Sequence, residues 1–582
     1  MMENRSVRLS LPGLSTIRPA LLPALGLLLL TAIFTWPLLR APGTIIAVDE
    51  GDPLFNAYVL NWGAYALFYE PGNVFDAPFY YPSLNTLSLS DHLLSVSWPF
   101  SPLVFLGNPV LFYNVLFVGS FFLSAFLFFR YLSVLGLGPM AAWCGAALFG
   151  FLPWKYGQLS HIQLLFTWWI PFTLLQFESW RKRPSFLRAS ATGLGFALVF
   201  LSSVYHGLFF FLFFPLYAAV RTLSARRDPS RVPGRLRVSH AAAGAAVAFI
   251  VMAPSLLAYA RVPTVIRHLN SIAMITPRGA DLTDYVNPPA GSRLWSAFGK
   301  STHPYSDVPW EMHAFPGGLP LAAFAVALPL VAWRRRELRA ALPAWTAVPA
   351  LLAASAACFI VSLGPVLHSG GVTIGRSLPY EWLFHFFSPL RAVRVPARAA
   401  FYVGLAGAAI AAILIELAGR SLRTPKRQVF FAFFIVLVLI DVWPRPMPFV
   451  RPTEYLRLRH AFQATNSAVG HDGTDLVLPI NDAINYAAPL ASAGPFRFLV
   501  NGKSGYLLPE NARIFENLSF ATPGPALVDT LYSLSVTRLF VDRQRLGPDA
   551  ASRIVALLDA RSVTVRSLGT FSDYDALVIQ WP

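Results

Sequence analysis

Apolar segments long enough to cross a bilayer recur along this chain, and short clusters of Lys and Arg separate them. Hydrophobic residues make up 55% of the sequence and charged residues only 13%, which is far more apolar surface than a soluble chain could bury. The pattern therefore predicts a polytopic α-helical membrane protein. With roughly 20 apolar residues per span, the candidate helices lie near 20–39, 101–129, 138–154, 162–180, 239–260, 315–333, 343–364, 399–418 and 427–444.

The apolar stretch 189–220 holds either one helix or two. One helix would place the basic clusters at 181–188 and 221–237 on opposite sides of the membrane. Two short helices with a turn at 202–207 place both clusters on the same side, as the positive-inside rule favours. The total is then about 11 transmembrane helices, with residues 1–19 cytoplasmic and the chain in the inner (plasma) membrane.

The formal charge of +17 does not indicate nucleic-acid binding. The Lys and Arg residues sit in short clusters between apolar spans, as expected for loops held against an anionic cytoplasmic leaflet. The two cysteines, Cys144 and Cys358, both lie inside apolar stretches. A disulfide framework and a Cys-ligated metal are therefore not expected.

Residues 450–582 change in character, because polar residues return and apolar residues alternate along short runs. Alternation with a period of two predicts strands at 475–480, 536–542 and 574–580. Helical patterns lie between them, near 521–534 and 549–560. We expect a small extracytoplasmic α/β domain that follows a membrane domain of residues 20–449.

The first external loop, residues 41–100, carries acidic side chains and no Lys or Arg, in a chain that is otherwise strongly basic. This segregation of charge marks the loop as the candidate site. The acidic residues are Asp49, Glu50, Asp52, Glu70, Asp76 and Asp91.

Asp52 precedes Pro53, and Asp followed by Pro is a favourable start for a helix. One interpretation is therefore that Asp52 is a helix cap and has no other role. Asp49 and Glu50 have no such local role in the sequence. Three carboxylates within four residues repel one another unless a cation, a metal or a proton shares the site. We therefore expect a working site here, followed by an amphipathic helix at 54–62 that lies on the membrane interface.

The chain resembles the GT-C superfamily of integral-membrane glycosyltransferases in its arrangement of spans, acidic first loop and external domain. Particular stretches resemble a branch of bacterial members of that superfamily. These stretches are Gly51-Asp52-Pro53 with Asn56 and Trp62, Tyr80-Tyr81-Pro82, Asp91-His92-Leu93-Leu94, Ser160-His161-Ile162-Gln163 and Arg394-Val395-Pro396-Ala397-Arg398.

The resemblance implies that a first-loop acid is the catalytic base, that the donor is a sugar on a polyprenyl phosphate, and that the acceptor is an extracytoplasmic glycan, lipid or protein. A hydroxyl that attacks an anomeric carbon must lose its proton, and a carboxylate within reach takes it. Asp52 or Asp49 is the base, and the sequence leaves the choice open.

Arg394 and Arg398 are candidates to hold the phosphate of the donor, because a guanidinium makes paired hydrogen bonds to phosphate oxygens. The alternative is that they pair with the acidic loop or anchor to lipid headgroups. Polar side chains at the outer mouth of the bundle are the other substrate-binding candidates, against simple capping or interhelical hydrogen bonding. They are Glu50, Asn56, Asp91, His92, His161, Gln163 and Tyr205.

The resemblance also allows a divalent cation, Mg²⁺ or Mn²⁺, for which Asp49, Asp52 and His92 are the candidate ligands. The long external loop 262–312 suggests a lid. A transporter or flippase of lipid-linked glycans is the alternative function, and it predicts inverted repeats and ionisable groups near mid-membrane. A scaffold protein without catalysis is a third possibility.

Overall fold

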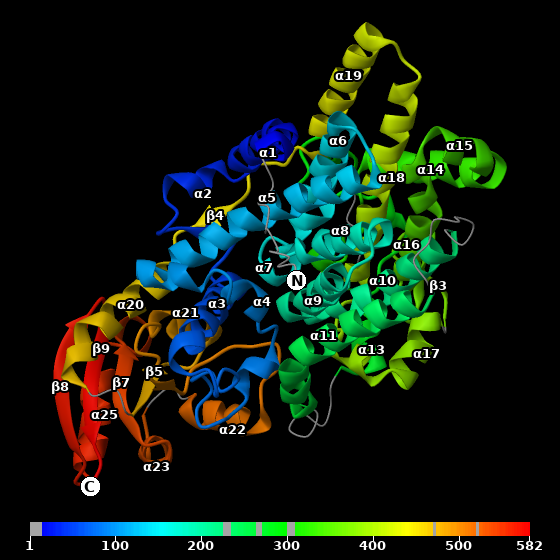
Figure 1. The fold of residues 1–582 in the computed structure, drawn as a ribbon. Coiled ribbons are helices and arrows are strands. Elements are labelled where there is room, and N and C mark those ends of the chain that lie inside the picture. Colours follow the sequence, from blue (N-terminus) through cyan, green and yellow to red (C-terminus); the bar gives the residue numbers. More distant parts are fainter. Residues whose placement is uncertain are drawn as a thin grey trace, which may run out of the picture.

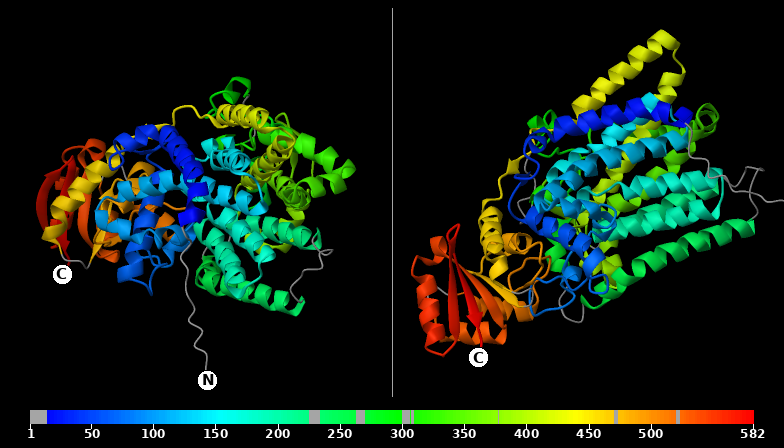
Figure 2. Two further views of the ribbon diagram at one scale, coloured as in Figure 1. Left: turned by 45° about the horizontal axis from the view of Figure 1, so that its top comes forward. Right: turned by 60° about the vertical axis from the view of Figure 1, so that its left-hand side comes forward.

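A bundle of long helices forms one end of the molecule and a small sheet forms the other (Figure 1 and Figure 2). The computed structural model describes residues 14–224, 234–262, 270–299, 306, 309–376, 378–469, 473–519 and 523–582. The terminal residues 1–13 and the basic loop residues 225–233 lie outside this part of the chain.

Each of the predicted membrane segments falls on a helix of the bundle, and five of these regions are long and apolar enough to cross a membrane. The total of about 11 transmembrane helices stays a prediction. The bundle helices are α1 (Leu14–Phe34), α5 (Pro109–Leu135), α6 (Pro139–Gly150), α8 (Trp169–Lys182), α9 (Phe186–Ser202), α10 (Val204–Ser224), α11 (Gly234–Ala260), α14 (Gly318–Trp333), α16 (Val348–Ser362), α18 (Ala400–Arg420) and α19 (Thr424–Val442).

The stretch 189–220 forms two helices, as predicted, because the backbone of Ser203 is extended (φ −160°, ψ 127°) between α9 and α10. α9 packs against α11 where Gly193 meets Gly244. A Cβ atom on Gly193 would lie 1.9 Å from the carbonyl oxygen of Gly244, so only glycine fits. Small residues commonly allow such close helix contacts in membrane proteins.

The C-terminal part contains a five-stranded mixed sheet with the strand order β6-β5-β7-β9-β8. β5 runs parallel to both β6 and β7, whereas β9 runs antiparallel to β7 and β8. The three predicted strands are present as β5, β7 and β9, while β6 and β8 were not predicted. The bounds are β5 (Thr474–Leu478), β6 (Phe498–Leu499), β7 (Val536–Asp542), β8 (Thr564–Phe571) and β9 (Tyr574–Gln580).

Helices cover both faces of this sheet, and the alternation of side chains along the strands explains why. Leu476 and Leu539 face a core shared with α22 (Pro509–Leu518), α23 (Pro525–Ser533) and α25 (Ala550–Asp559). Val477 and Phe540 belong instead to the core that extends through α20 (Thr453–Thr465) and α21 (Asp482–Ala491) into the bundle. The domain therefore shares one of its two cores with the rest of the protein.

The first external loop joins the C-terminal part at two places. Near the start of the loop, β1 (Ile46–Ala47) pairs antiparallel with β4 (Phe449–Val450). Farther along, the backbone of residues 78–81 runs beside β6: the N–H of Leu499 donates to the carbonyl of Pro78 at 2.9 Å, and the N–H of Tyr81 donates to the carbonyl of Leu499 at 3.0 Å. The loop therefore extends the edge of the sheet.

The helix after the acidic residues, α3 (Asp52–Tyr69), does not lie on an open interface, so that prediction is wrong. Every residue from Leu54 to Trp62 is buried. The reason is that α21 packs on α3 from one side and α5 from another, with the short α4 (Leu94–Ser97) alongside (Figure 1). α3 thus lies between the bundle and the C-terminal domain, and its first residue is Asp52.

Candidate active site

Asp52 begins α3, but its side chain does not cap the helix. The capping position is Gly51, and no side chain caps the helix there. The two oxygens of the Asp52 carboxylate instead face two different parts of the protein. Oδ2 lies 3.2 Å from His161 Nε2, and Oδ1 accepts a hydrogen bond of 3.2 Å from the hydroxyl of Tyr486 in α21. The capping interpretation is therefore wrong, and the side chain remains 38% exposed.

Burial raises the pKa of Asp52, but the hydrogen bond and charge of His161, the hydroxyl of Tyr486 and the charge of Arg398 outweigh it and hold the pKa below its ordinary value. Asp52 is therefore a carboxylate at neutral pH. Because it is ionised and partly exposed, it is able to accept a proton from a group that approaches from outside.

His161 connects Asp52 to a second, more deeply buried pair. Its Nε2 lies 3.7 Å from Glu311 Oε1, and Glu311 Oε2 accepts a hydrogen bond of 2.7 Å from the guanidinium of Arg398. Arg398 is only 3% exposed, and its guanidinium also lies 4.4 Å from the ring centre of Tyr205. Arg398 is thus occupied by Glu311 and Tyr205, which leaves it poorly placed to hold a phosphate.

Arg394 is in a different position. It is half-buried. Burial raises the pKa of Glu311, but the charge of Arg398 lowers it, and the charge of Arg394 also lowers it, to a smaller extent. Its backbone N–H donates to the hydroxyl of Tyr205 at 3.1 Å. Its guanidinium has no hydrogen bond or ion pair with any side chain in the described ranges. Of the two predicted phosphate ligands, Arg394 alone has a guanidinium available.

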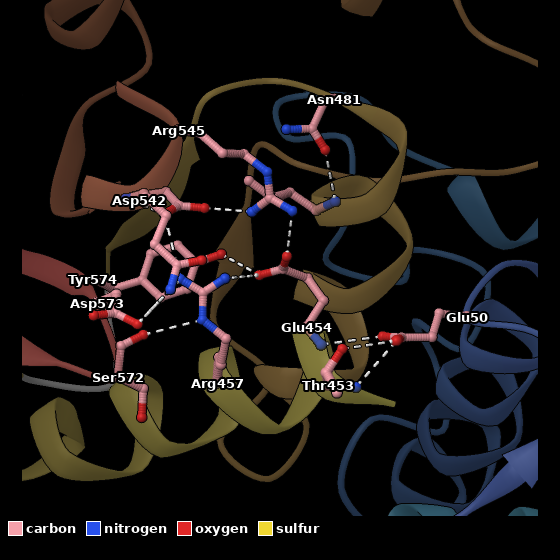
Figure 3. Close-up of polar contacts among 12 residues, drawn as sticks. Glu50, Thr453, Glu454, Arg457, Asn481, Asp542, Arg545, Ser572, Asp573 and Tyr574 are labelled. Atoms are coloured by element: carbon pink, nitrogen blue, oxygen red, sulfur yellow. Dashed lines mark hydrogen bonds and ion pairs between the residues drawn. The ribbon is translucent and has the colours of Figure 1, made fainter. Parts of the chain in front are cut away.

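Asp49 and Glu50 do have local roles, contrary to the expectation from the sequence. Asp49 Oδ1 accepts from the N–H of Gly51 at 2.8 Å, and its Oδ2 accepts from Ser160 Oγ at 2.9 Å. Glu50 caps α20, because its oxygens accept from the N–H groups of Thr453 and Glu454, each at 3.1 Å (Figure 3). Asp49 thus contacts the bundle, Glu50 contacts the C-terminal domain, and Asp52 contacts both.

Asp91 and His92 are both buried. Asp91 Oδ1 accepts from the N–H of Val204 at 2.6 Å, at the start of α10, and burial raises its pKa to about 6. His92 lies between Phe75 and Tyr259, and burial lowers its pKa to about 3. Asp91 lies close enough to feel the charge of Arg398, whereas the described contacts of His92 are hydrophobic apart from the N–H of Leu94.

The two predicted amide side chains differ. Asn56 is buried and donates to the backbone carbonyl of Asp52 at 2.9 Å, so it supports the first turn of α3. Gln163 is buried in α7 (Ile162–Leu165), and its Oε1 has no hydrogen-bond partner among the residues that the structure describes. A buried amide oxygen without a partner is rare and therefore a candidate contact for a ligand.

The candidate metal ligands do not come together. Among the described residues, no group of three or more His, Cys, Asp or Glu side chains is placed to hold a metal ion. The contacts of His92 do not include Asp49 or Asp52, and the positive charge beside Glu311 comes from Arg398. The residues of this site therefore do not fit the predicted divalent cation.

Two residues of the site were not predicted from the sequence. Glu311 lies at the end of the long external loop, in no recognisable motif. Tyr486 lies 434 residues from Asp52 along the chain. An acidic residue shortly before a predicted span was the only available signal for Glu311, and nothing in the sequence indicated Tyr486.

No family model and no curated protein matches this chain. Among solved structures, it is similar to the oligosaccharyltransferase AglB of Archaeoglobus fulgidus with an acceptor peptide, at 13% identity and a TM-score of 0.48, over 94% of this chain and 73% of that one. It is also similar to ArnT of Cupriavidus metallidurans bound to undecaprenyl phosphate, at 12% identity and a TM-score of 0.42, over 97% and 98% of the two chains. A further AglB structure, with zinc and sulfate, has 12% identity and a TM-score of 0.45, over 90% of this chain and 68% of that one.

Proposed function

We propose that this protein is a membrane glycosyltransferase that moves a sugar from a polyprenyl-phosphate donor to an extracytoplasmic acceptor. The observation that carries the proposal is the position of Asp52, an ionised and accessible carboxylate connected through His161 and Glu311 to Arg398, with the charge of Arg394 nearby. A base and a phosphate ligand are the two groups that this transfer needs most.

In the proposed reaction, the acceptor hydroxyl attacks the anomeric carbon of the donor sugar and gives its proton to Asp52. The hydroxyl oxygen forms the new bond to the anomeric carbon as the bond from that carbon to the phosphate oxygen breaks. The electron pair of the broken bond stays on the polyprenyl phosphate. His161 and Tyr486 hold the two oxygens of Asp52, so the carboxylate keeps a fixed orientation.

Arg394 is the side chain that would stabilise the departing phosphate. A guanidinium placed where negative charge develops lowers the barrier, and it costs no reorganisation if it is in place beforehand. Arg398 would act indirectly, by neutralising Glu311 so that the carboxylate does not repel the donor. This assignment separates the two arginines that the sequence could not distinguish.

A donor panel tests the proposal. The purified chain is incubated with radiolabelled polyprenyl-phosphate sugars, and release of polyprenyl phosphate is measured with and without membrane extracts as a source of acceptor. We expect one donor to be consumed by the natural sequence and not by Asp52→Asn. If no donor is consumed, or if the Asn variant is as active as the natural sequence, the proposed function is wrong.

The proposal also requires the site to lie outside the cytoplasm. A reporter that is active only in the periplasm should work when it is fused after Arg451 and fail when it is inserted at residues 226–237. The opposite pattern would place Asp52 on the cytoplasmic side, away from the expected acceptor.

A further inference from the structure

Among the described residues, one side chain of the C-terminal domain, that of Tyr486, forms a hydrogen bond with the candidate base. Tyr486 lies on the second turn of α21, and this helix packs directly on α3. Its hydroxyl donates to Asp52 Oδ1 at 3.2 Å, the one hydrogen bond that the described structure gives this hydroxyl. A phenol that donates to a carboxylate favours the charged form of that carboxylate.

Tyr486 is itself held from behind. Lys503, from the loop that follows β6, places its Nζ 5.5 Å from the ring centre of Tyr486. The same Nζ forms an ion pair with Asp482 at 2.8 Å. An ammonium near an aromatic face attracts the ring, so Lys503 favours the orientation in which the hydroxyl points at Asp52.

The domain is also fixed to the same loop two residues before Asp52. Glu50 caps α20, and the neighbouring Glu454 then bonds to Arg545, Arg457 and the hydroxyl of Tyr574, which lie around the sheet (Figure 3). The acidic segment is thus attached to the C-terminal domain at Glu50 and again at Asp52. This double attachment leaves little freedom for Asp52 to move away from Tyr486.

We propose that Tyr486 is a positioning residue for the base, so that the C-terminal domain forms part of the catalytic site. This inference rests on the proposed function. It goes further because it assigns the partner of one of the two carboxylate oxygens of Asp52 to a residue outside the membrane domain. Tyr486 sets the orientation of Asp52 and keeps it ionised, while His161 does the same from the bundle.

The pKa of Asp52 depends on every charged group near its carboxylate. These groups are His161, Asp49, Arg398, Glu311 through His161, and Asp482 with Lys503 behind Tyr486. Replacing Tyr486 by Phe keeps the ring, the packing of α21 and all of these charges, and removes one hydroxyl. The substitution therefore isolates the hydrogen bond.

We expect Tyr486→Phe to lower kcat by about 10- to 150-fold, the range for a hydrogen bond to a charged group, with little change in the donor KM. Because the lost bond favoured the carboxylate form, the pKa of Asp52 should rise. The acidic limb of the pH–rate profile should therefore move to higher pH. The matched control is Tyr532→Phe, an exposed tyrosine of the same domain, which should change neither quantity.

A second measurement does not depend on turnover. A water-soluble diazo reagent esterifies carboxyl groups in their protonated form, and mass spectrometry of the peptide that contains Asp52 gives the extent of labelling at each pH. In Tyr486→Phe, labelling of Asp52 should persist to higher pH than in the natural sequence. Lys503→Met should move it in the same direction, with no further change in the double variant if Lys503 acts through Tyr486.

The outcomes separate the two claims. If the labelling curve and the pH–rate profile of Tyr486→Phe match those of the natural sequence, Tyr486 does not position the base. If the labelling curve moves but the natural sequence consumes no donor in the panel, the proposed function is wrong while the contact with Asp52 stands. Movement of both supports the inference.

Discussion

Two acidic clusters in the bundle region differ in how completely their charges are matched. Near the end of α8, Glu178 is fully buried, and its two oxygens accept four hydrogen bonds of 2.7 Å from Arg181, Arg221 and Tyr217. In the other cluster, His161, which directly precedes α7, stands between Asp52 and Glu311.

The second cluster is incomplete. Asp52 is partly exposed. Among the described residues, Nδ1 of His161 and Nε of Arg398 have no hydrogen-bond partner, and Arg394 makes no ion pair. A buried polar atom without a partner costs free energy, so this cluster stabilises the fold less than the cluster around Glu178. The comparison contrasts a cluster of closely paired charges with one that, under the proposed function, would bind and react.

The largest expected effect concerns Asp52. Asp52→Asn should lower turnover by about 10²- to 10⁴-fold, the contribution of a general base, because an amide cannot accept the proton. The melting temperature should stay close to that of the natural sequence, since Asn has the same shape and its one carbonyl oxygen is still able to accept from Tyr486. Donor turnover and thermal unfolding of the purified variant check this, and a large loss of stability would remove the contrast with Glu178.

Glu178→Gln should do the reverse. Removing the charge leaves the buried Arg221 and the partly buried Arg181 without an anionic partner, which costs roughly 3–5 kcal/mol when a buried pair is broken. Reduced yield and a lower melting temperature in detergent are the expected results. The exposed Glu337→Gln is the control and should behave like the natural sequence. A stable Glu178→Gln variant would show that this cluster is not structural.

Arg394→Lys tests the open cluster more finely. The variant keeps the charge but loses the planar guanidinium, so turnover should fall by about 10- to 150-fold, equivalent to roughly 1.5–3 kcal/mol for a charge-assisted hydrogen bond. Stability should not change, because Arg394 pairs with no described side chain. Arg398→Lys is the comparison, and it should lower the melting temperature because Arg398 is buried against Glu311 and Tyr205. Equal turnover with Lys and Arg at 394 would exclude a role in binding phosphate.

The smallest effect is expected at Glu50. Glu50→Ala removes the cap of α20, which is worth about 0.5–2 kcal/mol. Faster proteolysis between the bundle and the C-terminal domain, at nearly unchanged donor binding, would show that Glu50 attaches the domain and does not contact substrate. A loss of donor affinity would instead return Glu50 to the substrate-binding residues predicted from the sequence.

Hydropathy alone predicted the helices of the bundle, because burial in lipid requires long apolar runs with few exceptions. The positive-inside rule also resolved the break at Ser203. The edge elements of the sheet were missed for physical reasons: β6 has only two residues, and β8 is a largely exposed edge strand with no clear alternation. The predicted interfacial position of α3 was wrong because a buried helix and an interfacial helix have similar apolar compositions.

The candidate site residues named from the sequence belong to short local motifs. Asp52 and its neighbours form a local acidic segment, His161 lies in a polar stretch at the mouth of the bundle, and Arg394 and Arg398 share one short motif. Glu311 and Tyr486 depend on contacts between distant parts of the chain, which no local pattern encodes. The bonds from Ser160 to Asp49 and from Thr453 to Glu50 could not be predicted either, because these partners lie 111 and 403 residues away.

The pairing of residues 78–81 with β6 has a consequence for how the protein is made. The two segments are separated by more than 400 residues, so at about 5–20 residues per second a ribosome needs roughly 20 to 80 s between them. During that time the acidic loop has neither its sheet edge nor Tyr486 in place. The candidate site therefore becomes complete only after residues 486–499 have been made, and chains that terminate before Tyr486 should carry Asp52 without its hydrogen bond from the C-terminal domain.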